Sequence, residues 1–157
     1  MLKTIRDILS IGNGAATNGS SDGIAWFNAN DGAIASVPVN GANGDSAPIV
    51  RALERLASLD GAIASGVWDS TAGKQEFQFD FDEVLYFLEG EVHVTAEGKT
   101  YTFRAGDVAF VRAGTHMSWD VPKYIRKVWI HRYPRRARLR RALRKLRDVA
   151  LLRESRA

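Results

Sequence analysis

The chain has 157 residues, 45% of them hydrophobic and 25% charged, which allows one domain with a packed core. It has no cysteine, so disulfides, thiolate metal sites and a cysteine nucleophile are excluded. Residues 134–157 carry ten Arg or Lys against two acidic residues, whereas residues 1–133 carry 12 bases and 16 acids. A mildly acidic body therefore precedes a strongly basic tail.

Residues 1–62 are predicted to form an extension of loops, short strands and helix. A short helix is expected over residues 2–10, a loop over 12–23, and strands at 26–27 and 34–39 around a turn signal at 30–32. An N-cap at Ser46 and apolar residues at helical spacing predict a helix over about residues 48–60, namely Ile49, Leu53, Leu56 and Leu59. Charges interrupt the apolar N-terminus and no stretch is long enough to span a membrane, so a cytoplasmic protein is expected.

From residue 63 onward the apolar period changes to two, which is typical of strands. Gly-containing turn signals at 72–73, 89–90, 97–98, 105–107 and 113–114 divide this region. The strand-like runs are 64–68, 76–81, 84–88, 91–96, 100–104, 108–111, 117–121 and 125–132. Eight short strands at about ten-residue spacing predict a mainly β protein with a sandwich or barrel over residues 63–132.

The tail, residues 133–157, is predicted to form a basic amphipathic helix, which spans residues 135–152. Leu139, Leu143, Leu146 and Ala150 form one apolar stripe, and the other faces are largely Arg or Lys. Docking on protein, binding to an anionic membrane and binding to nucleic acid are the competing interpretations. The stripe has no Trp or Phe and the tail has no groove-reading motif, so docking on protein is favoured.

Several short motifs occur in order between residues 66 and 132. They are Gly66-Val67-Trp68, Thr71-Ala72-Gly73, Asp82-Glu83, Leu88-Glu89-Gly90-Glu91, Ala105-Gly106-Asp107, Ala113-Gly114, Trp119 and Arg126-Lys127-Val128. In these motifs the chain resembles the cupin superfamily, and within it the cupin_3 group that includes ureidoglycine aminohydrolase. The resemblance implies a single jelly-roll β-barrel that binds a small molecule, and we expect a homodimer.

The resemblance also implies where a metal would be bound. Metal-binding cupins carry two His and one Glu on the first motif and one His on the second, a ligand set that suits a divalent ion. Those positions fall on Phe77, Phe79, Glu83 and Met117 in this chain. Because only Glu83 can ligate, we expect no metal and no other cofactor. The alternative is a residual metal site formed by Glu83 and His116, one residue from the fourth position.

Glu83 is the candidate catalytic residue, because the resemblance directs it inward among apolar side chains. Desolvation there would raise its pKa and suit a general acid or base. Alternatively, Glu83 pairs with Lys127 or Arg112 and satisfies a buried charge. His93 is expected at the surface, and the face occupied by His131 is left open. The predicted ligand-binding residues are Trp68, Phe77, Phe79, Tyr86, His116, Met117, Trp119 and Lys127.

Two functions of different classes follow. The first is binding of a small polar organic molecule, with metal-independent isomerase, lyase or cyclase chemistry that uses Glu83. The second is a non-catalytic binding or assembly module whose basic helix recruits a partner. A fold that hosts many functions cannot decide between them.

Overall fold

The computed structural model describes residues 19–21, 23–30, 36–37 and 48–134, and all regular elements within these ranges are strands. Three short strands come first: β1 (Gly19–Ser21), β2 (Ile24–Trp26) and β3 (Ser36–Val37). The rest are β4 (Val50–Ala57), β5 (Ile63–Gln78), β6 (Asp82–Ala96), β7 (Lys99–Arg104), β8 (Val108–Val111) and β9 (His116–Arg132).

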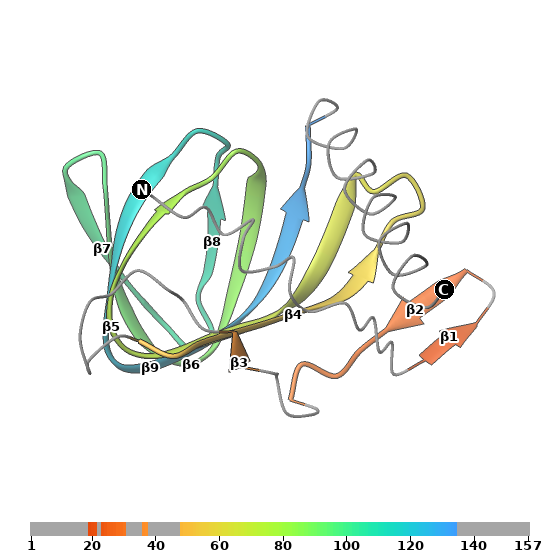
Figure 1. Cartoon of the computed structure of the whole chain (residues 1–157), viewed down its shortest axis with the longest axis horizontal. Helices are drawn as coiled ribbons and strands as arrows, with labels where there is room; N and C mark the ends of the chain where they lie inside the picture. Colours follow the sequence, from red (N-terminus) through yellow and green to blue (C-terminus); the bar gives the residue numbers. More distant parts are fainter. Residues whose placement is uncertain (1–18, 22, 31–35, 38–47, 135–157) are drawn as a thin grey trace, which may run out of the picture.

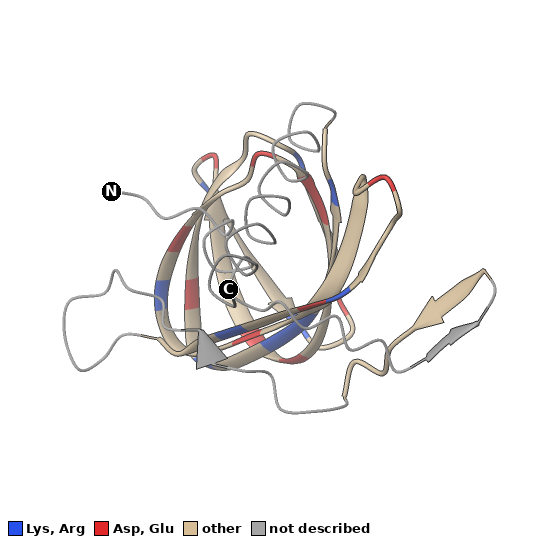
Figure 2. Ribbon diagram, turned by 45° about the vertical axis from the view of Figure 1, so that its right-hand side comes forward, with Lys and Arg blue, Asp and Glu red and all other residues tan. Residues whose placement is uncertain are grey.

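One antiparallel sheet contains most of the described chain. Its strands follow the order β3-β4-β5-β9-β6-β7, and β8 pairs with β6 beside β7. β1 and β2 form a separate two-stranded hairpin. The sheet curls so that one face is enclosed and the other is turned outward (Figures 1 and 2). This is the mainly β, jelly-roll-like arrangement that the sequence predicts.

Three long strands replace six of the eight short strands predicted from the turn signals. Predicted turns at residues 72–73 and 89–90 are irregularities within β5 and β6, where the pairing register shifts near Gly73 and Gly90. Both glycines have positive φ, 144° and 79°, so the same residue type that makes a turn here bends a continuous strand. The predicted turn at 97–98 is confirmed as the hairpin between β6 and β7.

The helix predicted over residues 48–60 is wrong, because residues 50–57 form β4 and pair with β5. A register shift lies between Glu54 and Leu56 in this pairing. The extra residue places Leu53 and Leu56 on the same face although they are three positions apart. A bulged strand therefore reproduces the spacing that helices show.

Alternation along β5, β6 and β9 divides the side chains between two faces. On β9, alternate residues between Met117 and His131 face the enclosed side and are buried. On the neighbouring strand β6, Glu83, Leu85 and Phe87 face the same side and are also buried. The core lies on this inner face and is rich in aromatic rings. As predicted, Phe77 and Phe79 are buried there while Glu76 on the same strand is exposed.

The helices predicted over residues 2–10 and 135–152 lie outside the described residues. Within the described ranges no helix is long and apolar enough to cross a membrane. The short strand predicted at residues 34–39 corresponds to β3, which pairs with β4 at one edge of the sheet.

Candidate functional site

The carboxylate of Glu83 is the centre of a polar cluster on the inner face. β9 lies beside β6 and supplies Lys127 and His131 on the same side of the sheet. Both contact one oxygen of the carboxylate: Lys127 Nζ and His131 Nε2 are each 3.1 Å from Glu83 Oε1. All three side chains are buried, so the cluster is an ion pair removed from solvent with a histidine attached to it.

The hydrogen bonds of His131 define its tautomer. A carboxylate only accepts hydrogen bonds, so His131 Nε2 carries the proton that it donates to Glu83. In neutral imidazole, Nδ1 is then an acceptor, and the hydroxyl of Tyr133, 3.0 Å away, donates to it. The polar chain therefore runs from Tyr133 through His131 to Glu83 and Lys127.

Two opposing effects determine the charge state of the pair. Burial alone raises the pKa of Glu83, but the ammonium of Lys127 and the hydrogen bond from His131 outweigh it and hold this pKa below its ordinary value. Burial lowers the pKa of Lys127 by more than Glu83 raises it. The prediction that the pKa of Glu83 is raised is wrong. Sequence reasoning did not foresee that Lys127 and His131 both donate a hydrogen bond to Oε1 of its carboxylate.

Aromatic rings form the walls around Lys127. Its ammonium lies 4.6 Å from the ring centroid of Trp119 and 5.1 Å from that of Trp68. Phe77 contacts both indoles in edge-on geometry. These ring faces attract the ammonium electrostatically and separate it from water.

Several buried polar atoms on this face have no hydrogen-bond partner among the residues that the structure describes. They are the second carboxylate oxygen Glu83 Oε2, Gln75 Oε1 and the indole nitrogens of Trp68, Trp119 and Trp129. Each such group costs about 1–3 kcal/mol if it stays unpaired. Among the described residues, the inner face therefore holds three unpaired donors and two unpaired acceptors.

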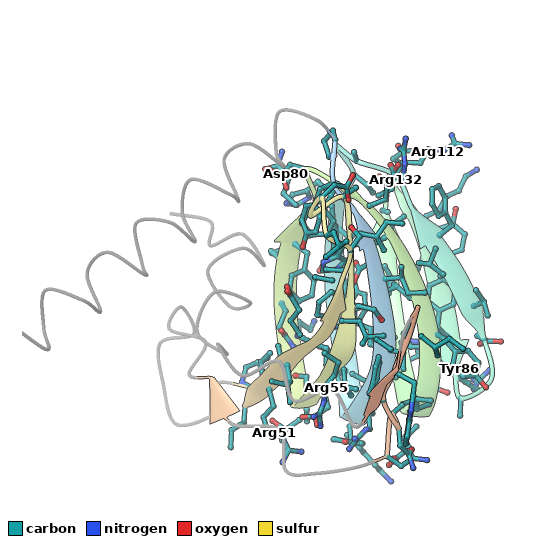
Figure 3. All side chains as sticks on the ribbon, turned by 90° about the vertical axis from the view of Figure 1, so that its right-hand side faces the viewer. Arg51, Arg55, Asp80, Tyr86, Arg112 and Arg132 are labelled. Atoms are coloured by element: carbon teal, nitrogen blue, oxygen red, sulfur yellow. The ribbon has the colours of Figure 1, made fainter. Side chains whose placement is uncertain are left out.

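The structure brings together most of the predicted site residues. Glu83 shares the inner face with Trp68, Phe77, Phe79, Met117, Trp119 and Lys127. Tyr86 and His116 do not join them: both were predicted to bind the ligand, but both lie on the outer face (Figure 3 labels Tyr86). Tyr86 is 46% exposed, and the His116 side chain is 54% exposed with Nε2 3.5 Å from Glu76 Oε2.

Of the four metal positions that the resemblance implies, Phe77 and Phe79 carry no donor atom, Met117 offers only a soft thioether, and Glu83 alone suits a hard divalent ion. Phe77 and Met117 lie directly opposite each other on β5 and β9, and Phe79 is also buried. A Glu83–His116 metal site is excluded, because the two residues point to opposite faces. No group of three or more His, Cys, Asp or Glu in the described part of the chain could hold a metal ion. These residues do not fit a metal, and no step of the chemistry below uses one.

Sequence reasoning missed three residues of the site: Trp129, His131 and Tyr133. All are buried on the inner face, and the His131 ring stacks 4.1 Å from that of Trp129. The signal was present, since residues 127, 129 and 131 share one face of a strand and Lys127 was already among the predicted ligand-binding residues. His93 is a surface residue as expected, with Nδ1 3.0 Å from the Thr102 hydroxyl.

The curled antiparallel sheet has a cupin-like fold. The solved structure of EutQ from Clostridium difficile shares the fold, with a TM-score of 0.51 and 18% identity over 59% of this chain and 74% of that chain. Residues 57–129 match the family described as the EutQ-like cupin domain, cupin_3.

Relatives with higher identity cover shorter segments. A crystal structure of EutQ from Salmonella typhimurium has a TM-score of 0.50 and 28% identity over 54% of this chain and 69% of that chain. The curated protein "Acetate kinase EutQ" of Salmonella typhimurium is 37% identical over 51 residues, 32% of this chain. The match spans only 22% of that relative, about a fifth of its length.

Proposed function

We propose that the inner face binds a small polar organic molecule and that Glu83 acts on it as a base. The observation that carries the proposal is the set of buried polar atoms on the inner face, Glu83 Oε2 among them, that have no hydrogen-bond partner in the described part of the chain. A molecule with oxygen acceptors for the indole N–H groups and a hydroxyl or amide donor for Glu83 Oε2 would complete them. Aromatic walls with a few converging polar groups are the general form of a small-molecule site.

The contacts of Glu83 support a base better than an acid. Its lowered pKa keeps the carboxylate ionised near neutral pH, so Oε2 is ready to accept a proton. Oε1 is held by Lys127 and His131, which orients the carboxylate. The ammonium of Lys127 stabilises negative charge that develops on a substrate oxygen when the proton leaves carbon. Isomerisation, elimination and cyclisation belong to this reaction class.

The acetate kinase activity in the relatives' name is not part of the proposal. The matched segment is about a fifth of those proteins, so the activity of the whole relative does not transfer with it. A non-catalytic binding module remains the second hypothesis. In that hypothesis the bound molecule is not altered and the basic C-terminal tail recruits a partner.

The test is native mass spectrometry of the full chain, purified without a His tag, for a bound molecule that is released on denaturation. We expect one organic ligand per chain, and weaker retention in Trp68→Phe and Trp119→Phe, by about tenfold each. These changes keep the rings but remove the N–H donors. Trp26→Phe is the matched control, because Trp26 is 53% exposed on β2. Equal retention in all three variants, or a stoichiometric metal in place of an organic ligand, would contradict the proposal.

Turnover distinguishes the two hypotheses. The released molecule is identified and returned to the protein in excess, and its conversion is followed by mass spectrometry together with exchange of its protons for deuterium. Conversion or exchange that is lost in Glu83→Gln/Lys127→Met supports the Glu83–Lys127 pair as the reacting groups. Retention without either reaction indicates the binding module.

A further inference from the structure

Lys127 differs from the other lysines of the described chain in its surroundings. Lys74, Lys99 and Lys123 are exposed, whereas Lys127 is 2% exposed and lies on the inner face. Lysine acts as a nucleophile through its neutral amine, and removal from water favours this form over the ammonium. The burial of Lys127 therefore suits covalent chemistry as well as charge pairing.

The contacts of Lys127 place a proton acceptor beside its nitrogen. Glu83 Oε1 lies 3.1 Å from Nζ, and the ring centroids of Trp119 and Trp68 lie 4.6 Å and 5.1 Å from it. Of these three groups, only the carboxylate can take a proton from the ammonium. One proton moved across this contact turns the ion pair into a free amine beside a carboxylic acid. Burial supports the transfer, since it lowers the pKa of Lys127 by more than Glu83 raises it.

We propose that Lys127 is a nucleophile that forms an imine with an aldehyde or a ketone on the inner face. The inference rests on the proposed function, because the carbonyl compound is the small organic molecule that this face binds. It names the chemical class of that molecule. It also gives Lys127 a covalent role, so that electrons are withdrawn from the substrate through a bond and not only through space.

The protons of this reaction balance within the Glu83–Lys127 pair. The ammonium first gives one proton to the carboxylate, and the free amine then adds to the carbonyl carbon while an electron pair moves to the oxygen. That oxygen takes one proton from the nitrogen and one from Glu83, and it leaves as water. The ammonium and the carbonyl compound thus become a protonated imine and water, and Glu83 is a carboxylate again.

The protonated imine would fit the site as the ammonium does now. It keeps the positive charge beside Glu83 and near the faces of Trp68 and Trp119, which attract a cation. It also draws electrons from the neighbouring carbon, so a proton on that carbon becomes easier to remove. Glu83 Oε2 has no hydrogen-bond partner among the described residues and can accept that proton. The product is an enamine, from which isomerisation or elimination proceeds.

Reductive trapping with propanal and sodium cyanoborohydride measures this reactivity in the full-length wild type. The reductant converts an imine into a stable propylamine, and peptide mapping by mass spectrometry follows each lysine separately. Lys74 is the matched control, since its Nζ lies 3.5 Å from Asp120 Oδ2 but its side chain is 79% exposed. We expect early modification of Lys127 to be about tenfold faster than that of Lys74. Equal or slower modification of Lys127, which burial without imine chemistry predicts, would overturn the proposal.

Lys127→Arg provides a second measurement. Arginine keeps a positive charge beside Glu83, but its guanidinium is always protonated and does not form an imine. With circular dichroism as a folding check, we expect the rapid phase of propyl incorporation to disappear while modification of Lys74 keeps its rate. A rapid phase that persists in this variant would place the reactive amine elsewhere and refute the assignment.

The outcomes separate this inference from the function on which it rests. Retention of an organic ligand that depends on Trp68 and Trp119, without preferential trapping at Lys127, refutes the imine and leaves the binding site intact. Preferential trapping at Lys127 without any retained organic ligand supports the nucleophile and contradicts the proposed binding function.

Discussion

Replacing Glu83 by Gln removes the negative charge of the buried ion pair and keeps the shape of the side chain. The ammonium of Lys127 is then buried without a counter-charge, and its only other described contacts are the faces of two indoles. Breaking a buried pair from one side typically costs about 3–5 kcal/mol. We expect a loss of this size, a large share of the about 5–15 kcal/mol that stabilises most domains.

The assay is urea unfolding of the wild type, Glu83→Gln, Lys127→Met and the double variant, each followed by tryptophan fluorescence. The double variant has no unpaired charge, so its loss should be smaller than the sum of the single losses by at least about 2 kcal/mol. Additive losses, or a loss below about 1 kcal/mol in Glu83→Gln, would refute the reasoning that the pair is buried and mutually dependent.

Two further predictions concern acid stability and backbone packing. The folded-state pKa of Glu83 lies below its ordinary value of 4.5, so its stabilising contribution is present above pH 4.5 and is lost as pH falls through the lowered pKa. Urea midpoints at pH 7 and pH 3 should therefore differ more in the wild type than in Glu83→Gln/Lys127→Met, and an equal difference would count against this assignment. Gly90 and Gly98 have similar φ, 79° and 74°, but an added Cβ meets the Tyr124 carbonyl at Gly90 and open space at Gly98. Thermal or urea unfolding should show a loss of about 1–2 kcal/mol for Gly98→Ala and at least about 2 kcal/mol more for Gly90→Ala, whereas equal losses would show that the close approach is relaxed.

Alternation and turn chemistry predicted which face many side chains occupy. The resemblance to cupins implied that Phe77, Phe79 and Met117 face the interior, and all are buried there. His116, one residue from Met117 on a strand, falls on the opposite face as alternation requires. The same rule applied to Glu83 and Tyr86, three positions apart on β6, would have placed Tyr86 outside.

Bulges account for the main errors in the fold. A strand with one extra residue places Leu53 and Leu56 on one face, and periodicity alone cannot distinguish this from a helix. Gly73 and Gly90 resemble turn residues because turns and bulges both use positive φ. At both glycines the strand continues because it pairs with β9. That long-range pairing cannot be read from the local sequence.

The electrostatics of the site depended on a contact that the sequence could not specify. Lys127 was one of two cations expected to pair with Glu83. The number of residues between β6 and β9 does not fix which residues of the two strands lie opposite each other, so the choice stayed open. Once paired, β9 brings both Lys127 and His131 to Glu83, and the direction of its pKa shift reverses. Burial alone predicted the opposite sign.

Indole ¹H–¹⁵N resonances test most directly whether the inner face binds a ligand. The chain has four tryptophans: Trp68, Trp119 and Trp129 carry buried N–H groups with no partner among the described residues, and Trp26 is exposed. Spectra are compared between natively purified protein and the same protein unfolded, stripped by dialysis and refolded, with the released fraction then added back. We expect the three buried indole signals to shift on stripping and return on addition, while the Trp26 signal stays in place. Unchanged buried signals, or a change at Trp26 alone, would contradict binding at the inner face.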